Sequence, residues 1–90
     1  MNEEQFRQKL RDEGYTEPEV HEVEPESEKF LKMHTHDQST MSLVLSGEFT
    51  MITESGSRTY KQGDWCENPA GTLHAERIGP EGATALVAKR

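Results

Sequence analysis

The spacing of apolar residues changes once along the chain, near Gly14. Before it, Phe6 and Leu10 lie four residues apart and form a narrow apolar stripe, which predicts a short α-helix over 2–13. Asn2 can cap this helix, in a capping box with the glutamine three residues later, and Gly14 can end it. We expect the helix to pack on the outside of the domain or on a partner.

After Gly14, short alternating runs are broken by turn residues every eight to twelve positions, which is typical of consecutive β-strands. Expected turns fall at 46–47, 55–57, 62–64, 69–71 and 79–82. Because closure removes exposed strand edges, we expect an all-β barrel or sandwich. The expected strands are 19–24, 29–36, 41–45, 48–54, 58–60, 65–68, 73–78 and 83–89.

Length and composition indicate one domain. We expect residues 1–18 to form its helix and linker and residues 19–90 to form its barrel. The chain has 90 residues, of which 31% are apolar. A chain of this size buries only roughly two thirds of its surface on folding. A metal ion, a partner subunit or both would therefore add stability, and a homodimer is a reasonable expectation.

The charge excludes some classes of partner. The net charge is −7, without a basic cluster, so we expect no nucleic-acid binding. No apolar run approaches the ~20 residues of a membrane span, and the first residues do not resemble a secretory signal. The lone Cys66 cannot form an internal disulfide. We expect a soluble cytoplasmic protein with no membrane association.

His34 and His36 are the first residues that suggest a specific chemistry. Residues i and i+2 of a strand point to the same face, so both imidazoles can reach one metal ion. His74, which follows a sharp corner, is the natural third ligand. Two neighbouring surface histidines also occur by chance, so this spacing alone is weak evidence. We interpret the fourth histidine, His21, as an exposed strand residue.

A longer pattern surrounds His74. Gly63 is followed after five residues by Pro69-Ala70-Gly71 and after two more by His74. Glycine closes turns that need positive φ, and the proline–glycine corner directs the next strand. This pattern resembles the second motif of the cupin superfamily, and His34-x-His36 followed by Gly47 resembles the first.

The chain is thus similar to small single-domain cupins of the cupin 2 type. The resemblance implies a double-stranded β-helix, or jelly-roll barrel, in which His34, His36 and His74 converge on one divalent metal ion. Two positions depart from the family pattern. Thr40, next to Met41, stands where a fourth, glutamate ligand is usual, and Ile78 stands where asparagine is common. Asp37 and Glu67 are two alternatives to the glutamate, and no spacing argument selects either.

A site of three neutral imidazoles leaves the full +2 charge on the metal and keeps coordination positions open, so it should attract a small anionic ligand. Imidazole ligands do not distinguish Fe, Zn, Ni, Mn, Co and Cu. We expect a metal-binding module that binds or senses such a ligand. The alternative is a metal-dependent dioxygenase or isomerase acting on a small carboxylate or thiol. A third interpretation is a structural metal ion that only stabilises the barrel.

For the enzyme, Arg58 or Arg77 could pair with a substrate carboxylate and Tyr60 could transfer a proton. An exposed strand position for each arginine, and barrel packing for Tyr60, are the simpler interpretations. Cys66 could face the cavity, but we expect it to pack as a small apolar residue. We also expect Trp65, with Phe49, Met51, Leu43, Leu45 and Leu86, to belong to the core or the cavity wall.

Overall fold

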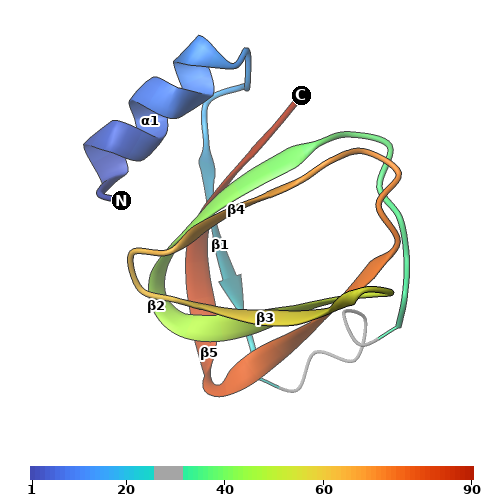
Figure 1. The fold of residues 1–90 in the computed structure, drawn as a ribbon. Helices are drawn as coiled ribbons and strands as arrows, with labels where there is room; N and C mark the ends of the chain where they lie inside the picture. Colours follow the sequence, from blue (N-terminus) through green and yellow to red (C-terminus); the bar gives the residue numbers. More distant parts are fainter. Residues whose placement is uncertain (26–31) are drawn as a thin grey trace.

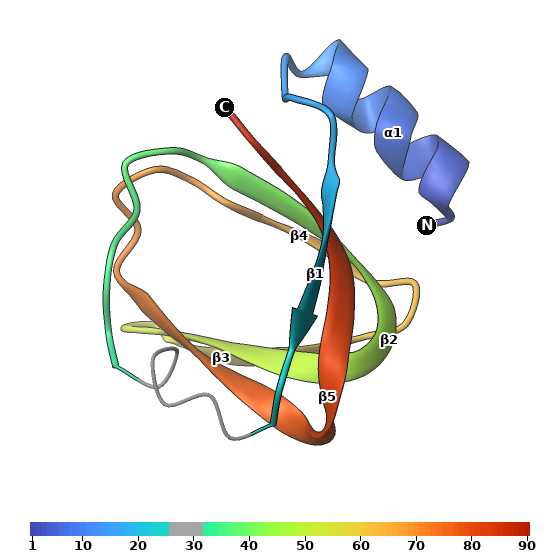
Figure 2. The ribbon, with the colours of Figure 1, turned by 180° about the vertical axis from the view of Figure 1, so that it is seen from behind.

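The computed structural model describes residues 1–25 and 32–90, which form one helix and a five-stranded antiparallel sheet. The strands follow the order β1-β5-β2-β3, and β4 pairs with β2. Figure 1 shows the sheet curling into a barrel, and Figure 2 shows the helix outside it, near the C-terminus. The elements are α1 (Glu3–Asp12), β1 (Glu19–Val23), β2 (Thr40–Thr53), β3 (Gly56–Lys61), β4 (Trp65–Asn68) and β5 (His74–Lys89).

Both ends of α1 form as predicted. The Asn2 side chain accepts a hydrogen bond from the backbone N–H of Gln5 at 2.8 Å, and the Gln5 side chain accepts one from Asn2 at 2.9 Å. At the other end Gly14 has φ +78°, and the N–H of Tyr15 donates to the carbonyl of Leu10 at 2.9 Å. This is a Schellman ending, which satisfies carbonyl groups that the last turn leaves open.

The apolar stripe of α1 packs on the outer face of the barrel. Phe6 and Leu10 are buried there, in one cluster with Tyr15, Met41, Leu43, Leu86 and Ala88. Trp65 differs from its prediction as a core or cavity residue, because 37% of its surface is exposed. Its ring lies on the helix side, where the Lys9 ammonium stands 4.7 Å from the ring centre.

Two predicted turns, at 46–47 and 79–82, lie within long strands instead. The pairing of β2 with β5 shifts register between Val44 and Ser46 and again between Gly47 and Phe49. A bulge bends a strand without ending its pairing. Gly47 has φ +71°, and a Cβ atom there would collide with the carbonyl oxygen of Gly82 on β5. The glycine therefore marks a sharp bend within β2 rather than its end.

The bulges also change which residues of β2 face inward. Thr40 and Ser42 line the interior before the bulges, whereas Phe49 and Met51 line it after them. Even-numbered residues thus face inward before the bulges and odd-numbered residues after them. One long strand therefore supplies both a polar and an apolar part of the same cavity.

The predicted strand 29–36 falls partly on residues 26–31, which lie outside the described part of the chain. Of the remaining residues, His34 forms an isolated bridge with His74, and no extended strand surrounds it. Within 1–25 and 32–90, no helix combines the length and the apolar character that a membrane crossing requires.

Candidate metal centre

Backbone pairing brings His34 and His74 together. The N–H of each residue donates to the carbonyl of the other, at 2.8 and 2.9 Å. The two ring centres are 4.4 Å apart. His74 is the first residue of β5 and directly follows the proline–glycine corner, so the corner places its ring as the sequence predicts.

His36 completes the group from the same segment as His34. Its carbonyl accepts a hydrogen bond from Gly71 at 2.9 Å, which ties the segment to the corner. The His36 ring centre lies 4.9 Å from that of His34 and 5.1 Å from that of His74. One nitrogen from each ring can be chosen so that all three lie within 4.8 Å of one another. The predicted convergence of the rings is confirmed, whereas metal binding itself stays a prediction.

Hydrogen bonds select the nitrogen that two of the rings can offer. Nδ1 of His74 is 2.9 Å from the carbonyl oxygen of Thr72, and Nδ1 of His34 is 2.6 Å from that of Lys32. A carbonyl oxygen can only accept, so each Nδ1 carries the proton and each Nε2 keeps its lone pair. Metal-ligating histidines commonly have such a partner behind the ring, because it fixes tautomer and orientation.

Burial increases across the group. His36 is exposed, His34 is partly buried, and the side chain of His74 is fully buried. Burial, followed by the charges of His34 and His74, lowers the pKa of His36 below its ordinary value. The lowered pKa favours the neutral imidazole, which is the form that ligates metals.

Asn68 is a functional neighbour that the sequence analysis missed. It is buried, and its amide nitrogen lies 3.2 and 3.3 Å from the two ring nitrogens of His74. Since Nδ1 of His74 carries a proton, the amide can donate only to Nε2, and a metal ion bound at Nε2 would replace this hydrogen bond. No spacing signal marks Asn68, because the pairing of β4 with β2 brings it there.

Glu76 is the second missed neighbour. Its carboxylate oxygen lies 3.7 Å from Nε2 of His74, and burial raises its pKa, while His74 and His34 oppose the rise. The two proposed substitutes for the family's glutamate have different positions. Asp37 lines the pocket beside His36, whereas Glu67 lies on the helix side and accepts a hydrogen bond from Tyr15 at 2.6 Å. Glu76 is two residues after His74, so the i, i+2 argument could have found it.

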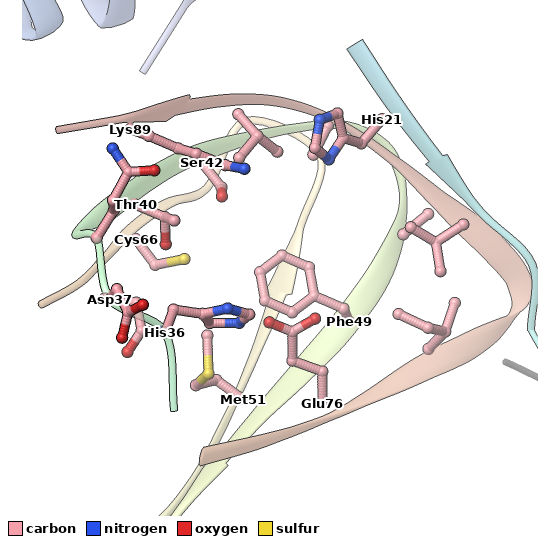
Figure 3. A pocket seen from close by; sticks show the side chains of 17 residues that line it. His21, His36, Asp37, Thr40, Ser42, Phe49, Met51, Cys66, Glu76 and Lys89 are labelled. Atoms are coloured by element: carbon pink, nitrogen blue, oxygen red, sulfur yellow. The ribbon is translucent and has the colours of Figure 1, made fainter. Parts of the chain in front are cut away.

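A pocket of about 520 Å³ opens beside the histidines, within the barrel (Figure 3). His36, Thr40 and Glu76 lie on its polar walls. His21 also lines the pocket, although it is exposed as expected.

The remaining predicted residues sort into wall and packing positions. Phe49 and Met51, which were expected in the core or the cavity wall, form part of the pocket wall. Cys66 lines the pocket and packs in a buried cluster with Val44 and Phe49. Burial raises the pKa of the Cys66 thiol to about 12, so the thiol stays neutral.

The residues proposed for catalysis do not line the pocket. Tyr60 stacks on Phe49 with ring centres 5.3 Å apart, and burial raises its pKa. Arg58 lies over the Tyr60 ring, and Arg77 is an exposed residue of β5. All three thus match their simpler interpretations.

The three histidines fit a divalent metal ion by their chemistry. Zinc binds imidazole nitrogen at ~2.0–2.1 Å, so two ligands of one ion are at most ~4.2 Å apart. The limit of 4.8 Å between the ring nitrogens is close to that value, and the exposed His36 side chain is free to close the difference.

Comparisons with known proteins agree with this architecture. A family model described as the ChrR cupin-like domain matches residues 5–90. The search of curated proteins gives no match.

Among solved structures, acireductone dioxygenase from Bacillus anthracis, with a cadmium ion in its active centre, matches at TM-score 0.73 and 14% identity, over 96% of this chain and 57% of that one. Protein NMB1881 from Neisseria meningitidis matches at TM-score 0.64 and 17% identity, over 99% and 96% of the two chains. A cupin-2 domain protein from Shewanella frigidimarina matches at TM-score 0.62 and 20% identity, over 77% and 64%.

The chain spans less than two thirds of the Shewanella protein and of the dioxygenase, and at these identities the likeness establishes the fold alone. The family match covers nearly the whole chain, including both histidine motifs. The chain therefore belongs to the ChrR cupin-like family, with a mostly β cupin fold and one short N-terminal helix.

Proposed function

We propose that the protein binds one divalent metal ion through His34, His36 and His74 and presents it to a small anionic ligand in the adjoining pocket. The convergence of three rings from two distant segments carries this proposal. Two of those rings are already held in the tautomer that ligation requires.

The charge of the ligand set favours an anion. Neutral imidazoles leave the charge of a divalent ion uncompensated, and a low-dielectric pocket strengthens its attraction for a negative group. Burial raises the pKa of Glu76, which opposes ionisation of this carboxyl group beside His74. When bound, the metal would supply a Lewis acid.

The chain's own residues would orient the ligand and limit water. Phe49 and Met51 form an apolar wall, and the carbonyl oxygen of Thr72 orients the ring of the buried His74. Within the described residues, no arginine lines the pocket, and Tyr60 is packed away from it. These positions favour binding over a reaction that needs a guanidinium group or a phenol.

A metal-dependent dioxygenase or isomerase is the second function that we propose to test. Its support is the fold shared with acireductone dioxygenase, whose structure holds a cadmium ion in the active centre. The substrate would be a small carboxylate or thiol, which can reach the open side of the metal.

Elemental analysis and two assays separate the two functions. We expect about one equivalent of metal per chain, thermal stabilisation by small acids or thiols, and no oxygen uptake. Oxygen consumption or turnover of these compounds would favour the enzyme. Absence of metal after loading with zinc, iron, nickel, manganese, cobalt and copper would remove both functions.

We also propose that the protein is cytoplasmic and forms a homodimer. Size-exclusion chromatography with light scattering tests the dimer, and a single-chain mass would contradict it.

A further inference from the structure

The pocket has two ends of different chemistry. Its apolar end lies under β1, and Val23, Ala83, Ala85 and Ile78 line it together with Phe49. Its polar end holds His36, Asp37 and the hydroxyl groups of Thr40 and Ser42. Figure 3 shows the two ends along one cavity, with His21 far from Asp37. A ligand that fills the pocket must therefore be amphipathic.

Lys89 supplies a cation at the polar end. It pairs with Thr40 across β5 and β2, and Thr40 pairs in turn with Asn68 on β4. Cross-strand partners have Cβ atoms ~4.5–5.5 Å apart, so these side chains form a continuous polar row. Because Asn68 contacts His74, the row leads from the lysine to the histidines.

The neighbouring row continues the same surface. Val87, Ser42 and Cys66 are partners across the same strands, and all three line the pocket. The Ser42 hydroxyl therefore lies one row from the Lys89 ammonium, on the same wall (Figure 3). Among the ion pairs of residues 1–25 and 32–90, none involves Lys89, so this ammonium can pair with a ligand.

Building on the proposed function, we infer that the ligand is an amphipathic monocarboxylate. Its carboxylate pairs with Lys89 beside the histidine cluster, and its apolar body lies against Phe49, Ile78 and Val87. A second carboxylate at the far end of the apolar body would lie among Val23, Ala83 and Ala85, where it would lose its hydration. Dicarboxylates should therefore bind more weakly than monocarboxylates of equal length.

Calorimetric titration of the zinc-loaded full chain with straight-chain acids from acetate to octanoate tests the inference. Burial of one methylene group is worth a factor of roughly four in affinity. We expect affinity to rise by about that factor per carbon until the apolar end is filled. An affinity that does not depend on chain length would overturn the inference.

Two substitutions on β5 test the role of Lys89. Lys89→Met should lower the affinity for every acid roughly tenfold or more, since it removes a charge-assisted hydrogen bond. Arg77→Met is the matched control, because Arg77 is an exposed cation of the same strand outside the pocket. Equal affinities for the two variants would overturn the role of Lys89.

Ala85→Leu tests the apolar end, because the larger side chain would fill it. We expect octanoate to lose its advantage over acetate while acetate binding is retained. If this variant does not fold by circular dichroism, Val87→Thr is the alternative, because it keeps the volume but makes the wall polar and should lower the gain in affinity per carbon. Unchanged chain-length dependence in the folded variant would overturn the placement of the apolar body. Failure of wild type to bind zinc would instead refute the proposed function.

Discussion

His74 and His36 occupy opposite extremes of burial within one ligand group. His74 is fully buried and has Thr72 and Asn68 as hydrogen-bond partners, so its ring is positioned before any ion arrives. His36 is exposed, so its ring has fewer packing contacts. Substitution of His36 therefore tests ligation with little effect on the core.

Cys66 provides a prediction at the scale of a single residue. Its thiol pKa is raised from 9.0 to about 12 by burial, so its thiolate fraction at pH 8 falls by roughly a thousandfold. We expect folded protein to react with an aromatic disulfide reagent at least a hundredfold more slowly than protein in concentrated urea. Comparable rates in the two states would show that Cys66 is accessible.

The grouping of His34, His36 and His74 is the part of the site that the sequence predicts well. The histidine spacing and the glycine–proline corner identify His34, His36 and His74 because both depend on local geometry. Glu76 follows the same i, i+2 rule but carries no motif. Asn68 and Lys89 reach the site through pairing between distant strands, which local spacing does not encode.

The strands show a similar division. The alternation of apolar residues predicts where β1 and β4 lie, and the capping box predicts α1. The alternation of apolar residues does not predict that β2 and β5 continue through their glycines. A glycine with positive φ is compatible with a turn or with a bulge, and only the pairing with β5 distinguishes them. The wrong prediction of a turn at 46–47, which divides β2 into two strands, thus has a physical cause.

Two glycines on this frame offer a matched comparison. Gly63→Ala should cost about 1–2 kcal/mol, because φ is +87° but space is open around the Cβ position. Gly47→Ala should cost at least about twice as much, because its Cβ would also collide with the Gly82 backbone. Urea unfolding of the two variants measures the difference. Equal losses would mean that β5 can move away from β2 at little cost.

Tyr15 connects the end of α1 to β4 through Glu67. Burial, followed by the hydrogen bond to Glu67, raises the pKa of Tyr15 from 10.0 to about 12. The folded state therefore keeps a proton that the unfolded chain loses near pH 10. The contribution of Tyr15 to the free energy of unfolding is complete below pH 10 and falls by about 2–3 kcal/mol as the pH rises to 12.

Tyr15→Phe checks this connection between helix and barrel. We expect a loss of about 1 kcal/mol at pH 7, since Glu67 stays partly hydrated when its partner is removed. The advantage of wild type over Tyr15→Phe in unfolding free energy should fall above pH 10 and reverse before pH 12, because the variant lacks the titrating hydroxyl. A difference that stays constant would show that the Tyr15 hydroxyl is not protected.

At the scale of the whole molecule, the barrel wall separates two apolar clusters. One lies under α1 and includes Phe6 and Leu10, and the other lines the interior and includes Val44 and Phe49. The interior cluster borders a cavity rather than a filled core. A small chain therefore has fewer packing contacts to stabilise it there. A metal ion that binds only the folded state would restore stability.

Zinc should therefore stabilise the whole fold in a pH-dependent way. At a free concentration one hundred times the Kd, binding adds about 2.7 kcal/mol, which for this chain length raises the Tm by roughly 10–20 °C. The lowered pKa of His36 keeps protons from competing near neutral pH. The gain should disappear toward pH 5 or with a chelator. A Tm that does not respond to zinc at pH 7 would contradict this stabilisation.

The most direct test of the account is the metal affinity of three proteins: wild type, His36→Ala and His21→Ala. Both substitutions remove an exposed histidine that lines the pocket, but only His36 belongs to the ligand group. Equilibrium dialysis against zinc should show one tight equivalent for wild type and for His21→Ala. His36→Ala should bind at least tenfold more weakly. Equal affinity of the two variants would contradict the three-histidine site.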